Sequence, residues 1–116
     1  MGAIALLLMA AQPAAAQDQL GFDIRCMVAS QLASEQVDDE AKSALSLATM
    51  FYFGRVDSVI SGAALEQRFA AESRNFEGRP LGPMLEQCGR FMEVRGKALE
   101  AIGAKLEAAE KARRTQ

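Results

Sequence analysis

Apolar residues recur at three- and four-residue spacing through most of the chain, which predicts helices. No stretch after residue 16 shows the two-residue alternation or the β-branched enrichment that is typical of strands. The pattern predicts four helices, over residues 23–34, 38–54, 61–75 and 83–113, separated by segments that contain Gly, Pro, Ser or Asp. We therefore expect an all-α, single-domain bundle of about four helices with a long C-terminal helix.

The ends of these segments carry residues that commonly start or stop helices. Asp23 lies at the predicted start of the first helix, where a negative charge interacts favourably with the positive end of the helix dipole. Asp38 fits the N-cap of the second helix, and Gly54 fits its end. Ser61 fits the start of the third helix, and Pro83 is a favoured first residue of the fourth. The apolar face predicted for the second helix joins Ala41, Ala44, Leu45, Ala48 and Tyr52.

The three adjacent acids Asp38, Asp39 and Glu40 have a second interpretation, a calcium site. A calcium loop needs ligands spread over about a dozen positions with a Gly turn, and that pattern is missing here. A helix cap with acids in the first turn is the favoured interpretation, and we predict no metal site.

The last predicted helix has a seam of mostly apolar residues at three-four spacing. The seam joins Leu85, Cys88, Met92, Arg95, Leu99, Ile102, Leu106 and Ala109. Gly89, Gly96 and Gly103 lie seven residues apart on the same helix, although each costs about 1 kcal/mol relative to Ala. They form either a smooth strip for close approach of another helix or a ligand, or merely a lenient surface.

The first sixteen residues resemble a secretory signal peptide. The apolar run from Ala3 to Ala11 has the length of its hydrophobic region, and Ala14 and Ala16 supply the small-residue cleavage pattern. We expect export to the periplasm or beyond and a mature domain over residues 17–116. No Lys or Arg precedes Arg25, so a true start upstream, a buried N-terminal helix and a retained membrane anchor stay open as alternatives.

Cys26 and Cys88 are the two cysteines, 62 positions apart. Both lie on predicted apolar faces, and an oxidising compartment permits a bridge between them. Redox-active cysteines usually lie close together in exposed, electropositive surroundings. We therefore predict a structural disulfide that joins the first helix to the last.

Composition argues against several functional classes. The chain has no histidine, which removes Ser–His and Cys–His nucleophile pairs and histidine metal sites. Thirteen basic and fifteen acidic residues give a net charge of −2, with no basic patch for nucleic acid. We expect no enzyme activity, no cofactor and no stable membrane span after signal removal.

Three consecutive aromatic residues, Phe51, Tyr52 and Phe53, precede Arg55 and Asp57. They span about 200° of a helix, so one narrow stripe cannot bury all three. Either two sides of the helix are covered or one ring is exposed. The five residues form a candidate binding patch; the alternative is core packing, with Arg55 bonded to the free carbonyls of the helix end.

The order of these motifs resembles a group of small secreted alphaproteobacterial proteins of unassigned function. The motifs are Cys26-Met27-Val28-Ala29, Phe51-Tyr52-Phe53-Gly54-Arg55 with Asp57, Ser61 with Leu65, and Cys88. More distantly, the architecture is similar to periplasmic acid-stress chaperones of the HdeA type. The tryptophan expected before the first cysteine of that family is replaced here by Asp23-Ile24-Arg25.

The leading hypothesis is an interaction or envelope stress-protection protein that binds partners through apolar helix faces. In its chaperone-like form, protonation of fifteen carboxylates leaves thirteen basic charges uncompensated and loosens the bundle. The alternatives are a carrier of a lipid or other small apolar ligand near Phe51, Tyr52 and Phe53, and a subunit whose last helix docks on another envelope protein. The last alternative requires an exposed seam beyond Leu99.

Overall fold

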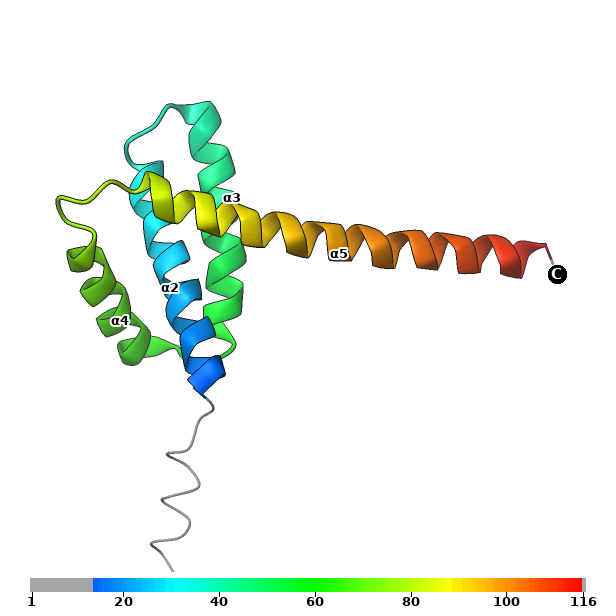
Figure 1. Cartoon of the computed structure of the whole chain (residues 1–116), viewed down its shortest axis with the longest axis horizontal. Helices are drawn as coiled ribbons and strands as arrows, with labels where there is room; N and C mark the ends of the chain where they lie inside the picture. Colours follow the sequence, from blue (N-terminus) through cyan, green and yellow to red (C-terminus); the bar gives the residue numbers. More distant parts are fainter. Residues whose placement is uncertain (1–13, 116) are drawn as a thin grey trace, which may run out of the picture.

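Four α-helices and no strands make up residues 14–115, the part of the chain that the computed structural model describes (Figure 1). The helices are α2 (Ala14–Ser34), α3 (Asp39–Asp57), α4 (Gly62–Asn75) and α5 (Gly82–Arg114). The predicted all-α class and the long last helix are confirmed.

Helix α2 is the centre of the fold. It packs against each of the other three helices, most extensively against α3. A helix with apolar residues on every side is stable only when it is covered on every side. The buried apolar residues of α2 are Leu20, Ile24, Cys26, Met27, Val28, Ala29 and Ala33.

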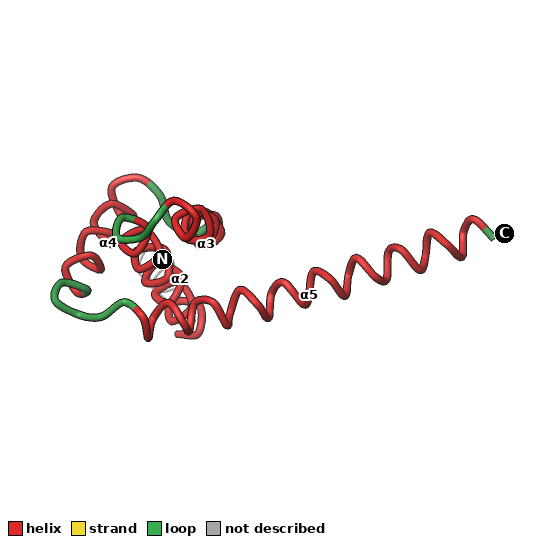
Figure 2. Tube along the Cα trace, turned by 90° about the horizontal axis from the view of Figure 1, so that it is seen from above, coloured by secondary structure: helices red, strands yellow, loops and turns green. Residues whose placement is uncertain are grey.

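Helix α5 divides into a packed part and a projecting part. Cys88 is buried, and Phe91 and Met92 are half-buried against the core. Between residues 93 and 115 only Glu110 is not exposed, and both views show this part of α5 pointing away from the other helices (Figures 1 and 2). We call residues 14–92 the head and residues 93–115 the arm.

The predicted start of the first helix at residue 23 is wrong by nine residues. Helix α2 begins at Ala14, and Leu20 and Gly21 are already buried. The segment before Asp23 consists largely of Ala, Gln and Leu, which are good helix formers. Asp23 therefore lies inside the helix. The prediction that its charge stabilises the positive end of the helix dipole is wrong as well.

The predicted end of the second helix at Gly54 is also wrong, because α3 continues to Asp57. Glycine in a helix interior destabilises the helix by about 1 kcal/mol relative to alanine. Contacts that the next turn of α3 makes with residues distant in sequence outweigh this cost. Val56 is fully buried, and Arg55 pairs with α2. The predicted apolar face is covered only from Leu45 onward; Ala41 and Ala44 are exposed.

The acidic triplet forms a helix cap. Asp38 is the N-cap of α3, and its Oδ1 accepts a hydrogen bond from the Ala41 N–H at 3.0 Å. At the next helix start, Ser61 holds the N-cap position without a side-chain cap bond. Gly62, with φ of 63°, lets the chain turn into α4.

The predicted signal peptide falls almost entirely outside the described residues. Of its sixteen positions only Ala14, Ala15 and Ala16 are described, as the exposed first residues of α2. A cut after Ala16 would therefore remove no buried side chain among them. None of the helices between residues 14 and 115 combines the length and the apolar character needed to cross a membrane.

Candidate functional site

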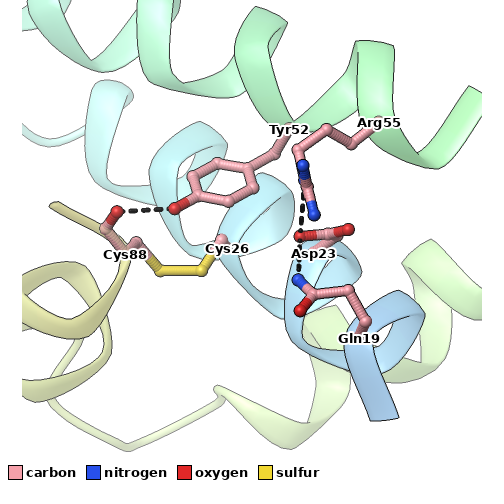
Figure 3. The surroundings of a disulfide bond; sticks show 6 residues. All are labelled: Gln19, Asp23, Cys26, Tyr52, Arg55 and Cys88. Atoms are coloured by element: carbon pink, nitrogen blue, oxygen red, sulfur yellow. Dashed lines mark hydrogen bonds and ion pairs between the residues drawn. A yellow bond between two sulfur atoms is a disulfide. The ribbon is translucent and has the colours of Figure 1, made fainter. Parts of the chain in front are cut away.

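The predicted disulfide is present. Cys26 of α2 and Cys88 of α5 are both buried, with their Cα atoms 5.6 Å apart, and the sulfur atoms are bonded (Figure 3). The bond fastens the second turn of α5 to the middle of the central helix. It therefore fixes the place from which the arm departs.

Tyr52 of α3 reinforces this attachment. Its side chain is fully buried, and its hydroxyl donates a hydrogen bond to the backbone carbonyl oxygen of Cys88 (Figure 3). The pKa of Tyr52 is raised to about 12, mainly by burial and in part by the charge of Asp23, while the charge of Arg55 opposes the rise. The phenol thus stays protonated and can donate the bond at any physiological pH.

Asp23 and Arg55 form an ion pair between α2 and α3. The Arg55 Nε donates to Asp23 Oδ1 at 3.1 Å, and the Gln19 Nε2 donates to the same oxygen at 3.0 Å (Figure 3). The Asp23 side chain is only 6% exposed, whereas that of Arg55 is 31% exposed. Removing Arg55 would leave a buried carboxylate without its countercharge, so the pair is essential to this contact.

Four aromatic rings from three helices form a cluster beside Arg55. The rings are Phe22 of α2, Phe51 and Tyr52 of α3, and Phe91 of α5, and the centroids of neighbouring rings lie 4.9–6.4 Å apart. The Arg55 guanidinium carbon lies 4.7 Å from the centroid of Phe91, within cation–π distance. Arg55 therefore bonds across the helix interface, and the prediction that it would bond the carbonyls of its own helix end is wrong.

The five residues of the predicted binding patch lie on two sides of α3. Phe51, Tyr52 and Arg55 face the contact with α2 and α5. Phe53 and Asp57 instead line a hollow toward α4. The structure therefore brings them together in groups of three and two, and the first group is engaged in packing. Of the two alternatives foreseen for the aromatic run, the second holds: α3 is covered on the side that faces α2 and α5, and the Phe53 ring stays 38% exposed.

An apolar groove lies between α3 and α4, with α2 as its floor. It has a volume of about 730 Å³, within the range of roughly 300–1,000 Å³ that is usual for ligand sites. Two of the residues that line it are charged, Asp57 and Glu66, and both are acidic. We call it the α3–α4 groove; its large apolar residues are Met27, Met50, Phe53, Leu65 and Phe69.

The arm carries a second apolar surface. Leu99, Ile102 and Leu106 are 69%, 55% and 67% exposed. Three-four spacing places them on one face of α5, in line with Cys88 and Met92, which the head covers. We call these three residues the arm stripe. It is the exposed seam beyond Leu99 that a docking subunit requires.

Groups of side chains that could bind a metal ion or react are scarce among residues 14–115. Between residues 14 and 115 no group of three or more His, Cys, Asp or Glu side chains is placed to hold a metal ion. Both cysteines are in the disulfide. The α3–α4 groove and the arm stripe are two exposed apolar surfaces suited to binding.

The main residue that the sequence reasoning missed is Asp23. It lies between Phe22 and Cys26 in the first predicted helix, one turn before a cysteine that was predicted to lie on an apolar face. A carboxylate in such a position needs a partner, because burial of an unpaired charge is very costly. That rule predicts an ion pair with a basic residue of a neighbouring helix, and Arg55 is such a residue.

Comparisons with known proteins give no relative from which to transfer a function. The chain matches no protein-family model, and neither a curated protein nor a solved structure shows a significant similarity to it.

Proposed function

We propose that this chain is a non-enzymatic interaction protein whose head presents the arm to another protein. The observation that carries the proposal is the exposure of Leu99, Ile102 and Leu106 on one face of a helix that leaves the head. An amphipathic helix of this kind binds by laying its apolar face against an apolar groove or another helix.

The attachment of the arm supports this proposal. The disulfide, the Tyr52 hydrogen bond and the cation–π contact of Arg55 with Phe91 all act on residues 88–91 of α5. They hold the base of the arm in one orientation while its remaining length stays free. A surface that is fixed before binding loses less conformational entropy when a partner docks.

We further propose that the protein works in an oxidising compartment such as the periplasm. The buried Cys26–Cys88 bond supports this setting, since disulfides of this kind are rare in the reducing cytosol. Export through the predicted signal peptide would bring the chain there.

Photo-crosslinking in the native host tests the proposed function. A photoreactive amino acid replaces Ile102 on the arm stripe or, in the matched control, Ala104 on the opposite face of α5. We expect position 102 to crosslink to a protein and position 104 not to. Absence of crosslinks from position 102, or equal crosslinks from both positions, would refute binding through the stripe.

The α3–α4 groove favours a second candidate function, the carriage of a small apolar ligand. Met27, Met50, Phe53, Leu65 and Phe69 give it a wall that an acyl chain or another apolar molecule could contact. Native mass spectrometry of the protein isolated from its host tests this function. Extra mass of a few hundred daltons would support a carrier, and a bare chain would argue against one.

A further inference from the structure

We infer that the arm stripe of one copy of this chain binds in the α3–α4 groove of a second copy. The inference rests on the proposed function and names the partner and the receiving surface. Each molecule carries both halves of the contact: an exposed apolar helix face on the arm and an apolar groove on the head.

The groove resembles a vacancy in a helical bundle. Helix α2 is its floor, and residues of α3 and α4 form its two walls. Helices α3 and α4 both pack on α2, whereas packing of α3 on α4 is slight at most. A further amphipathic helix laid between them would touch all three, which is the arrangement of a helix bound in a groove.

The arm of the same molecule does not fill this vacancy. None of the residues that line the groove belongs to α5. The base of α5 is fixed by the Cys26–Cys88 bond, and the arm continues away from the head as one uninterrupted helix (Figures 1 and 2). The stripe can therefore reach a groove of this kind only on another molecule.

Charge favours the same pairing. Residues 14–81 carry ten acidic and six basic side chains, whereas α5 carries five acidic and seven basic ones. The first part of the chain is thus net negative and α5 net positive, so α5 of one copy is attracted to the head of another. Opposite potentials on two surfaces guide their association.

The complementarity extends to single residues. Four charged side chains near the two surfaces form no ion pairs within residues 14–115: Asp57 and Glu66 in the groove, Arg95 one turn before the arm stripe, and Lys105 beside it. Docking of the stripe would bring two acidic and two basic side chains to the rim of one contact. Rim charges of this kind act mainly on specificity and on the rate of association.

The small residues next to the stripe suit such a contact. Gly96 and Gly103 flank it on one side of α5, and a Cβ atom at either position would meet nothing within 4 Å. No feature of the isolated chain therefore requires glycine there. In a groove, the missing side chains would let the helix backbone approach the walls more closely.

The test combines four single-surface variants of the full chain in analytical ultracentrifugation. The arm variant carries Leu99→Glu with Ile102→Glu, and its control is Val94→Glu, an exposed apolar position on another face of α5. The groove variant is Phe53→Glu, and its control is Leu47→Glu, an exposed α3 position outside the groove. Circular dichroism and denaturation of each variant establish that it folds.

We expect the natural chain and both controls to self-associate at micromolar concentration, and the arm and groove variants to remain monomeric. Mixing the two defective variants should restore a one-to-one complex. The groove variant keeps an intact arm, and the arm variant keeps an intact groove. This recovery is expected only if the arm stripe binds the groove.

Three outcomes would overturn the inference. The natural chain could be monomeric throughout the micromolar range, or the mixture of defective variants could fail to associate. Alternatively, the arm variant alone could lose association while Phe53→Glu keeps it, which would indicate pairing of one stripe with another. The proposed function survives any of these results if position 102 crosslinks to a different protein, and it fails if that position yields no crosslink.

Discussion

The head and the arm share one helix but differ in what covers it. Along α5 the same three-four spacing continues from Cys88 and Met92 to Leu99, Ile102 and Leu106. The first two side chains are covered by the head, whereas the last three are largely exposed. An apolar pattern therefore predicts which face of a helix will be covered, but not whether the cover comes from the same molecule.

The two regions also differ in the range of their interactions. The head is held by contacts between residues far apart in sequence, such as Cys26–Cys88 and Asp23–Arg55. The ion pairs of the arm join residues three or four positions apart, and such exposed pairs contribute about 0.3–0.5 kcal/mol each. We therefore expect substitutions in the head to change global stability far more than those in the arm.

The largest effect is expected from loss of the disulfide. Changing both Cys26 and Cys88 to Ala opens a loop of about 62 residues, which should lower the free energy of unfolding by about 4 kcal/mol. Chemical denaturation followed by circular dichroism measures this change. The natural chain under reducing conditions serves as the control. A loss below about 1 kcal/mol would mean that packing alone fixes α5 on the head.

The next effect concerns the Asp23–Arg55 pair, and it should be asymmetric. Arg55→Met leaves the Asp23 carboxylate buried without its countercharge and should destabilise the head by about 2–4 kcal/mol. Asp23→Asn should cost less, because Arg55 is 31% exposed and can turn toward water. Urea denaturation of the two variants measures the difference. Equal losses would contradict the buried position of Asp23.

A smaller effect is expected from Tyr52→Phe, which removes the hydrogen bond to Cys88 and should cost about 1 kcal/mol near neutral pH. The pKa of Tyr52 is about 12 in the folded state and about 10 in the unfolded state. Between these values the unfolded chain loses its phenolic proton first, so the stability of the natural chain falls as pH rises.

This fall should be on the order of 1 kcal/mol for each pH unit, and the Phe variant lacks that contribution. The stability advantage of the natural chain over Tyr52→Phe should therefore shrink between pH 10 and pH 12. Rapid urea titrations of both proteins across that interval measure it. A constant difference would indicate that Tyr52 ionises at its ordinary pKa.

The smallest effect is expected in the arm. Leu99→Ala should change the free energy of unfolding by less than about 0.5 kcal/mol in dilute, monomeric solution, because the side chain is 69% exposed. Gly103→Ala should increase the helicity of the arm without changing the unfolding midpoint of the head. Circular dichroism measures the helicity of both variants. A large loss with Leu99→Ala would mean that the head covers the arm in solution.

The sequence was sufficient for the fold class and for the disulfide. Cys26 and Cys88 each lie on an apolar stripe of a predicted helix, so both were expected in the core where the stripes meet. The helix ends at residue 23 and Gly54 were missed for a different reason. Capping residues and helix propensities describe only how well a residue suits a helix. The burial of Leu20 and Val56 depends on neighbours distant in sequence.

The candidate patch was predictable only in part. Residues four apart share a helix face, so Phe51 belongs with Arg55 and Phe53 belongs with Asp57. Treating all five residues as one patch ignored this separation. The spacing could not reveal what each face contacts. The first face packs against α2 and α5, whereas the second borders the open groove beside α4.

The attachment at Cys88 also has a mechanical consequence. From Cys88 to Arg114 the helix runs without interruption, a lever of about 40 Å at 1.5 Å per residue. A tilt of about 10° at its base would sweep the tip through about 7 Å over that length. Because the short end of this lever is covalently joined to α2, torque applied at the tip is delivered through the Cys26–Cys88 bond to the central helix of the head.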